Sequence, residues 1–323
     1  MDLPQPSAAT RMLSPTAESP TESALPRVAA TERLHTLMRL DPKAPEFLSA
    51  LRSHRQAREI EIVRLESTFP EMIVTVPDAW PSIVLAPLYD VHLGSREHDA
   101  TLFERHLLWF AETQNVLTWD GGDLIENASK LSIGASVFGQ DKTPHEQLVL
   151  ALKTLSLIQH KVLFTLPGNH EDRMDVMGED MAAWLATLLE VPYFPDYCFC
   201  TIKWRGNNFR LLAHHGSGGA QTAGAQRNAA RKDIAWARPF DLFWTGHLHQ
   251  PIADLLYQTD QDQSTGRMVE RNGFVMISPS YLHYFGGYGA KRRMTPGTRG
   301  LSAVELREDG RMDVSLHANG KRL

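Results

Sequence analysis

The sequence contains few cysteines, with only Cys198 and Cys200 among 323 residues. Two thiols separated by one residue fit the same face of a strand, and a zinc ribbon would need a second pair of cysteines. We therefore expect both side chains to be reduced members of the core, rather than a disulfide or a metal site.

Long hydrophobic runs are also missing, because no apolar stretch approaches the roughly 20 residues that a membrane helix requires. The N-terminus, Met-Asp-Leu-Pro-Gln-Pro-Ser, has neither a basic start nor an apolar segment, so no secretory signal is expected. A basic excess is missing as well, since the formal net charge is -5. An overall field that would attract nucleic acid is therefore not predicted. These features predict a cytoplasmic protein without a membrane partner, and they predict no particular oligomeric state.

The composition, 42% hydrophobic and 22% charged, is that of a globular protein with a sizeable core. Residues 1–30 are rich in proline, serine and threonine, which predicts a disordered tail. Residues 31–75 are expected to form a helical arm, with a second helix over Ala44–Leu65. The basic side of this arm suits either a partner or nucleic acid, or simple packing on the main domain, which we expect over residues 76–323.

In the main domain, short apolar runs alternate with helical patterns, and hairpins follow towards the C-terminus. This order predicts an α/β or mixed sheet with ligand groups at the strand ends. Polar groups do follow five of the apolar runs: Asp90-Val-His92, Gly122-Asp123, Asn169-His170, His214-His215 and His247-Leu-His249. Carboxylates, an amide oxygen and imidazoles form a mixed nitrogen and oxygen set, which suits Mn, Fe or Zn better than Mg or Ca. A carboxylate placed between two such ions would bridge them.

Taken in this order, the five motifs resemble those of the calcineurin-like metallophosphoesterases, and they extend from Asp90 to His249, about half of the chain. Parts of them are also similar, more loosely, to phosphoesterases of bacteriophages and prophages and to the phosphoesterase subunit of archaeal DNA polymerases. The resemblance implies an α/β (α+β) fold in which two mixed β-sheets pack as a sandwich flanked by helices, with a dimetal site at the strand ends.

The resemblance also implies roles for individual residues. One metal would be held by Asp90, His92 and His249, and the other by Asn169, His247 and one of His214 or His215, with Asp123 as the bridge. We favour His214, because it directly follows the apolar run. The cofactors would be two divalent ions, with Mn the first expectation and Fe, Zn, Ni or Mg as alternatives. His170, beside the catalytic bridge Asp123, would protonate the leaving oxygen while a metal-bound hydroxide attacks phosphorus.

The substrate residues follow from charge and position. Arg173 follows the Asn169-His170 turn and either contacts phosphate or pairs with Glu171 or Asp172. The loop that contains Lys291, Arg292 and Arg293 has aromatic neighbours, so it is either a phosphate grip or a solvated basic loop. We expect Asn127 to be a turn residue. The remaining histidines singled out as structural are His98, His106, His145, His160, His283 and His317.

These observations predict a metal-dependent phosphodiesterase whose substrate is a phosphoester in DNA, RNA or a nucleotide. One alternative is a phosphomonoesterase, including a Ser/Thr protein phosphatase. An alternative of another class is a non-catalytic binding scaffold on the same fold.

Overall fold

The computed structural model describes residues 25–129, 137–173, 178, 180–234, 236–237, 239–262, 264–291 and 293–318. Most of the predicted tail, residues 1–24, lies outside this range. Helix α1 begins inside the predicted tail, at Leu25.

The described helices are α1 (Leu25–Arg39), α2 (Phe47–Ser53), α3 (Ala100–Glu112), α4 (Pro144–Ile158), α5 (Met181–Leu189), α6 (Ala223–Asp233) and α7 (Tyr288–Lys291). Short 3-10 turns cover Val137–Gly139 and Gln159–Lys161. The strands are β1 (Glu61–Arg64), β2 (Glu71–Thr75), β3 (Ile83–Leu85), β4 (Val116–Asp120), β5 (Val162–Thr165), β6 (Tyr197–Trp204), β7 (Asn207–His214), β8 (Leu242–Thr245), β9 (Ile252–Gln261), β10 (Met268–Ile277), β11 (Leu301–Leu306) and β12 (Met312–Ala318).

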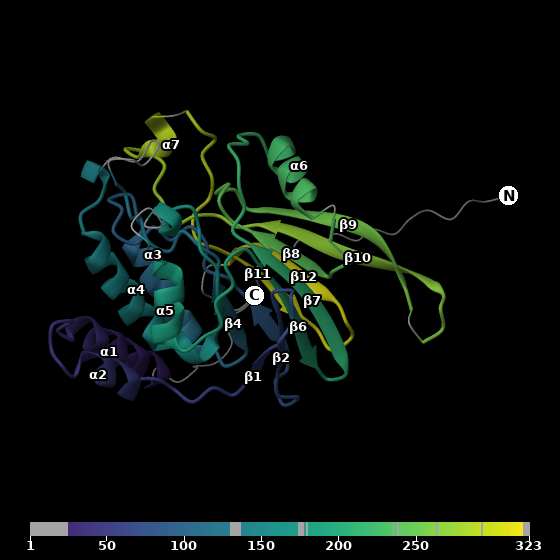
Figure 1. Cartoon of the computed structure of the whole chain (residues 1–323), viewed down its shortest axis with the longest axis horizontal. Coiled ribbons are helices and arrows are strands. Elements are labelled where there is room, and N and C mark those ends of the chain that lie inside the picture. The colour runs from purple at the N-terminus through teal and green to yellow at the C-terminus, as the bar shows by residue number, and fades with distance from the viewer. Residues whose placement is uncertain are drawn as a thin grey trace, which may run out of the picture.

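Two mixed sheets pack face to face between helices, which confirms the predicted sandwich (Figure 1). One sheet has the strand order β1-β2-β6-β7-β8-β10-β9, and the other has the order β12-β11-β3-β4-β5. The strands β7, β8 and β10 run parallel, as do β3, β4 and β5. Because parallel strands end at the same edge of a sheet, the loops after them gather at one side of the sandwich.

Apolar side chains fill three layers. Trp119 of β4 lies between the sheets, stacked on Phe164 and edge-on to Trp244, and all three are fully buried. Helices α3, α4 and α5 cover the outer face of the smaller sheet, with α1 and α2 packed against this helical layer, and α6 covers the larger sheet (Figure 1). The helices start where local chemistry favours it. Thr143 and Glu146, for example, form a reciprocal capping box at the start of α4.

The helical arm expected over residues 31–75 is wrong in its second half. Helix α2 ends at Ser53, and the chain then forms β1 and β2 instead of continuing to Leu65. The reason is tertiary, because β2 pairs in parallel with β6 and buries Met72 and Val74 between the sheets. Pairing in the sheet therefore stabilises this segment as two short strands more than an isolated helix would stabilise it.

The basic residues of the arm attach it to the main domain. Arg55 donates to the carbonyl of Leu188 at the end of α5. Arg58 donates to the carbonyls of Gln159 and Val162 at 3.2 and 3.3 Å. Of the two interpretations of this arm, the structure therefore favours packing on the main domain.

The C-terminal hairpins are confirmed, with β9 paired to β10 and β11 paired to β12 in antiparallel fashion. Cys198 and Cys200 are confirmed as buried free thiols of β6.

Candidate metal centre

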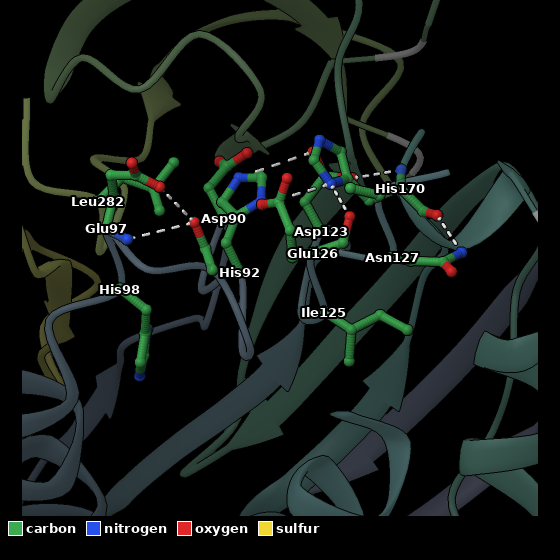
Figure 2. A network of polar contacts seen from close by, with 12 residues as sticks. Asp90, His92, Glu97, His98, Asp123, Ile125, Glu126, Asn127, His170 and Leu282 are labelled. Atoms are coloured by element: carbon green, nitrogen blue, oxygen red, sulfur yellow. Dashed lines mark hydrogen bonds and ion pairs between the residues drawn. The ribbon is translucent and has the colours of Figure 1, made fainter. Parts of the chain in front are cut away.

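The loops that follow β3, β4, β5, β7 and β8 bring the predicted polar residues together at one edge of the sandwich. Figure 2 shows Asp90, His92, Asp123, Glu126 and His170 gathered in one cluster. Three groups in it each contain three side chains that could hold a metal ion: Asp90, His92 and His249; His92, Asp123 and His170; and Asp123, His215 and His247. Asn169 lines the same cavity.

The backbone of the cluster is strained. Asp90, His92, Asp123, His247 and His249 all have φ between 51° and 63°, the left-handed region that non-glycine residues rarely adopt. Backbone hydrogen bonds help to hold these conformations, from the nitrogen of Asp90 to Gly122 and from that of His92 to Asp123. Such strain gathers where function requires a fixed geometry.

Asp123 is the centre of the cluster. Its Oδ2 lies 3.4 Å from Nε2 of His215, 3.7 Å from Nε2 of His170 and 4.0 Å from Nε2 of His92. Burial disfavours the ionised carboxylate, but the nearby His170 and His215 outweigh burial and hold the pKa of Asp123 well below its usual value. One carboxylate oxygen therefore faces three imidazole nitrogens.

Asp90 forms the second part of the cluster and is fully buried. Its Oδ1 lies 3.1 Å from Nε2 of His249, and its Oδ2 accepts the backbone N–H of His247 at 2.8 Å. The carboxylate thereby fixes the turn that carries both histidines.

Two of the imidazoles are oriented by backbone carbonyls. Nδ1 of His215 lies 2.9 Å from the oxygen of Gly121, and Nδ1 of His170 lies 2.6 Å from that of Glu126. A proton on each Nδ1 satisfies these contacts, and each Nε2 then faces Asp123. Burial lowers the pKa of His170 to about 4, whereas Asp123 overcomes the effect of burial and raises the pKa of His215 to about 10.

The cluster fits divalent metals. The Nε2 atoms of His92 and His215 are buried without a hydrogen-bond partner, although each faces the carboxylate of Asp123. Orphaned buried nitrogens are rare because they lose their hydration, and a cation held by nitrogen and oxygen ligands would satisfy them.

The structure separates the two adjacent histidines. His215 lies in the cluster, whereas His214 is still paired with Tyr197 in the ladder between β6 and β7. The ring of His214 stacks on that of Tyr197 at 4.3 Å, and its Nδ1 accepts the N–H of Gly216. The geometry therefore favours His215, against our preference for His214. The reason is that strand β7 extends one residue beyond the apolar run.

Glu171 and Glu126 also support the cluster, which their sequence positions did not predict. Glu171 is buried and accepts backbone N–H groups of Asp123, Ile125 and Gly168. Glu126 approaches Nδ1 of His92 at 3.1 Å. Gly168 is required at its position, because a Cβ there would lie 2.2 Å from Oδ1 of Asp123. Asn127, expected to be a turn residue, has φ of 41° and donates its Nδ2 to the carbonyl of His170.

A cavity of about 360 Å³ opens beside the cluster. Of the predicted substrate residues, Arg173 and Lys291 line it, while Arg293 is exposed and does not. Arg292 lies outside the described residues. Arg173 also donates to the backbone carbonyl of Glu126, a partner that neither interpretation named, and its contact with phosphate stays a prediction.

Most of the histidines expected to be structural lie away from the cluster. His106 is buried beside Tyr281, and Nδ1 of His98 lies 2.7 Å from the carbonyl of Val91. His283 differs, because it lines the cavity and contacts Arg299.

The fold and the cluster define a mixed α/β sandwich with side chains able to hold divalent metals. No family model matches the sequence, and no curated protein matches it. Among solved structures, the chain is similar to one titled "Structure of PhoD", with 13% identity and a TM-score of 0.37. The match covers 73% of this chain and 67% of that chain. Such a weak likeness carries no argument about this chain, so the family resemblance stays a prediction. Among the described residues, none of the helices combines the length and apolarity needed to cross a membrane.

Proposed function

We propose that the protein is a metal-dependent phosphoester hydrolase that cleaves a phosphodiester of a nucleotide or nucleic acid. The observation that supports this most directly is the position of Asp123, whose Oδ2 faces three imidazole nitrogens beside a cavity. A buried carboxylate shared by two of the three ligand groups has the place of a bridge between two cations.

Asp90, His92 and His249 would hold one ion, and Asn169, His215 and His247 the other, with Asp123 shared. When bound, such ions lower the pKa of a water ligand and neutralise charge on a phosphoryl group. The mixed nitrogen and oxygen donors make Mn²⁺ the first metal to test.

His170 is suited to move a proton at Nε2. Its Nδ1 faces the carbonyl of Glu126, its own carbonyl accepts from Asn127, and its backbone N–H is held by Oδ1 of Asp123. These contacts fix the ring so that Nε2 points into the cluster. With the pKa of His170 lowered to about 4, this nitrogen is unprotonated near neutrality, so it would first take a proton from the attacking water and then pass it to the leaving oxygen.

The cavity has room for the organic groups that a phosphodiester carries on two of its oxygens. A phosphoryl group alone would leave most of about 360 Å³ unfilled. Leu248, Leu282 and Tyr284 in its lining offer apolar contacts to a group on the second ester oxygen.

The test compares bis(p-nitrophenyl) phosphate with p-nitrophenyl phosphate, using metal-stripped protein with and without Mn²⁺. We expect metal-dependent turnover with the diester preferred, abolished by Asp123→Asn. His170→Ala should lower turnover about 100-fold while the bound metal is retained. A preference for the monoester would favour the phosphatase alternative, and metal binding without any turnover would favour the scaffold.

A further inference from the structure

The cavity beside the metal cluster is bounded by two loops that are joined to each other. Residues 218–221 form one wall, and residues from 282–291 and 294–297 contribute the other. The hydroxyl of Thr295 donates to the carbonyl of Gln221 at 2.9 Å, and Nε2 of Gln250 donates to the carbonyl of Thr295 at 2.9 Å. These contacts close the cavity on that side and give it the size of a small-molecule site.

The charges of the lining do not suit a long polyanion. Among the described residues that line the cavity, Arg173 and Lys291 are the ones with a lysine or arginine side chain. Arg173 is already hydrogen-bonded to Glu126, and Arg299, which follows the loop of Lys291 and Arg293, is paired with Asp99 and is not among the lining residues. A groove for single-stranded nucleic acid instead needs a row of cations along the backbone.

Glu97 gives the cavity an acidic side away from the metal ligands. Figure 2 shows it beside Leu282, on the other side of the cluster from Asn127. Ser95 donates its hydroxyl to Oε2 of Glu97 at 2.9 Å, and the backbone N–H of His283 donates to its carbonyl at 2.8 Å. Gly287 packs so closely that a Cβ there would lie 2.7 Å from Cγ of Glu97. The carboxylate is therefore held in place.

A fixed carboxylate repels phosphate but accepts hydrogen bonds from hydroxyl or ammonium groups. Resting on the proposed function, we infer that the substrate is a small phosphoester, or the end of a longer chain, whose alcohol part carries hydrogen-bond donors that reach Glu97. On this inference, an internal phosphodiester of a nucleic acid is not the substrate.

The first experiment offers the Mn²⁺-loaded full chain three substrates: bis(p-nitrophenyl) phosphate, the p-nitrophenyl ester of thymidine 5′-monophosphate, and circular single-stranded DNA. We expect both small esters to be hydrolysed and the circle to stay intact. Nicking of the circle at a comparable rate would overturn the inference while leaving the proposed function in place. Failure to hydrolyse any of the three would instead overturn the proposed function, and the inference with it.

The second experiment measures KM for the two small esters with Glu97→Gln. Loss of the charged acceptor should raise KM for the thymidine ester about tenfold more than for the ester without hydroxyls. Glu104→Gln, an exposed position on α3, is the matched control and should change neither value. Equal effects of Glu97→Gln on both KM values would show a structural role alone and overturn the assignment of Glu97.

Discussion

The carboxylate of Glu171 accepts the backbone N–H of Asp123 at 2.9 Å, and the same Oε2 accepts that of Gly168 at 2.9 Å. Its Oε1 accepts the N–H of Ile125. Burial and the nearby Asp123 raise the pKa of Glu171 to about 7, so the fold tolerates an unfavourable position for this acid. One side chain therefore joins the loop that carries Asp123 to the loop that carries Asn169 and His170.

Replacing Glu171 by alanine should loosen both loops together. Three buried N–H groups would lose their acceptor, which we expect to lower the free energy of unfolding by about 3 kcal/mol. Mn²⁺ affinity should fall about 10- to 100-fold, as it does when groups that orient metal ligands are removed. Urea unfolding and metal titration measure the two effects. Glu104→Ala is the exposed control, and unchanged Mn²⁺ affinity in Glu171→Ala would contradict the positioning role.

The order of motifs predicted the meeting of the strand ends, because polar residues directly after apolar runs gather at the edge of a sheet. The role of Glu171 could not be predicted in the same way. Its partners are backbone groups of residues up to 48 positions away, and backbone groups leave no trace in a sequence pattern.

Two further differences between the predicted and the observed structure concern where helices and strands begin and end. Ile60 and Val63 fit helical spacing, yet this region forms strands because β2 pairs with β6. The paired residues Val74 and Ile202 are 128 positions apart in the sequence. Local spacing contains no information about such a partner. Similarly, the choice between His214 and His215 depended on where β7 ends, and strand ends are the least certain feature of a sequence pattern.

The two thiols should be inert in the folded protein. Cys198 and Cys200 are both buried, and burial raises the pKa of each thiol above its usual value, so little thiolate is present. Ellman's reagent should therefore modify neither thiol of the native protein within minutes. After unfolding in guanidinium chloride, it should modify both. Rapid modification of the native protein would show that β6 opens or is exposed.

Lys161 should make stability depend on pH. Its Nζ donates to the carbonyls of Thr113 and Gln114, and burial lowers its pKa from 10.5 to about 8. Below this value the lysine is charged in both the folded and the unfolded chain, and its burial opposes folding. Between the two pKa values the unfolded chain binds more protons, so stability rises with pH.

We therefore expect the unfolding free energy of the natural chain, relative to Lys161→Met, to increase by about 2 kcal/mol between about pH 7 and about pH 9.5. Urea unfolding at the two pH values measures this difference. Lys43→Met, at an exposed position, is the matched control. A difference that stays constant or falls with pH would contradict the effect of burial on Lys161.

His214 and His215 provide the sharpest test of the cluster, because two adjacent imidazoles are expected to have different roles. His215 faces Oδ2 of Asp123 from a ring held by Gly121, so His215→Ala should remove a ligand and lower Mn²⁺-dependent diester hydrolysis by about 100-fold or more. His214 stacks on Tyr197, so His214→Ala should keep turnover within about threefold while lowering the unfolding free energy by about 1 kcal/mol. Turnover, bound Mn²⁺ per chain and urea unfolding of both variants measure these effects. If His214→Ala instead loses metal and His215→Ala retains it, His214 is the side chain that completes the cluster. Strand β7 must then end one residue earlier than the structure places it.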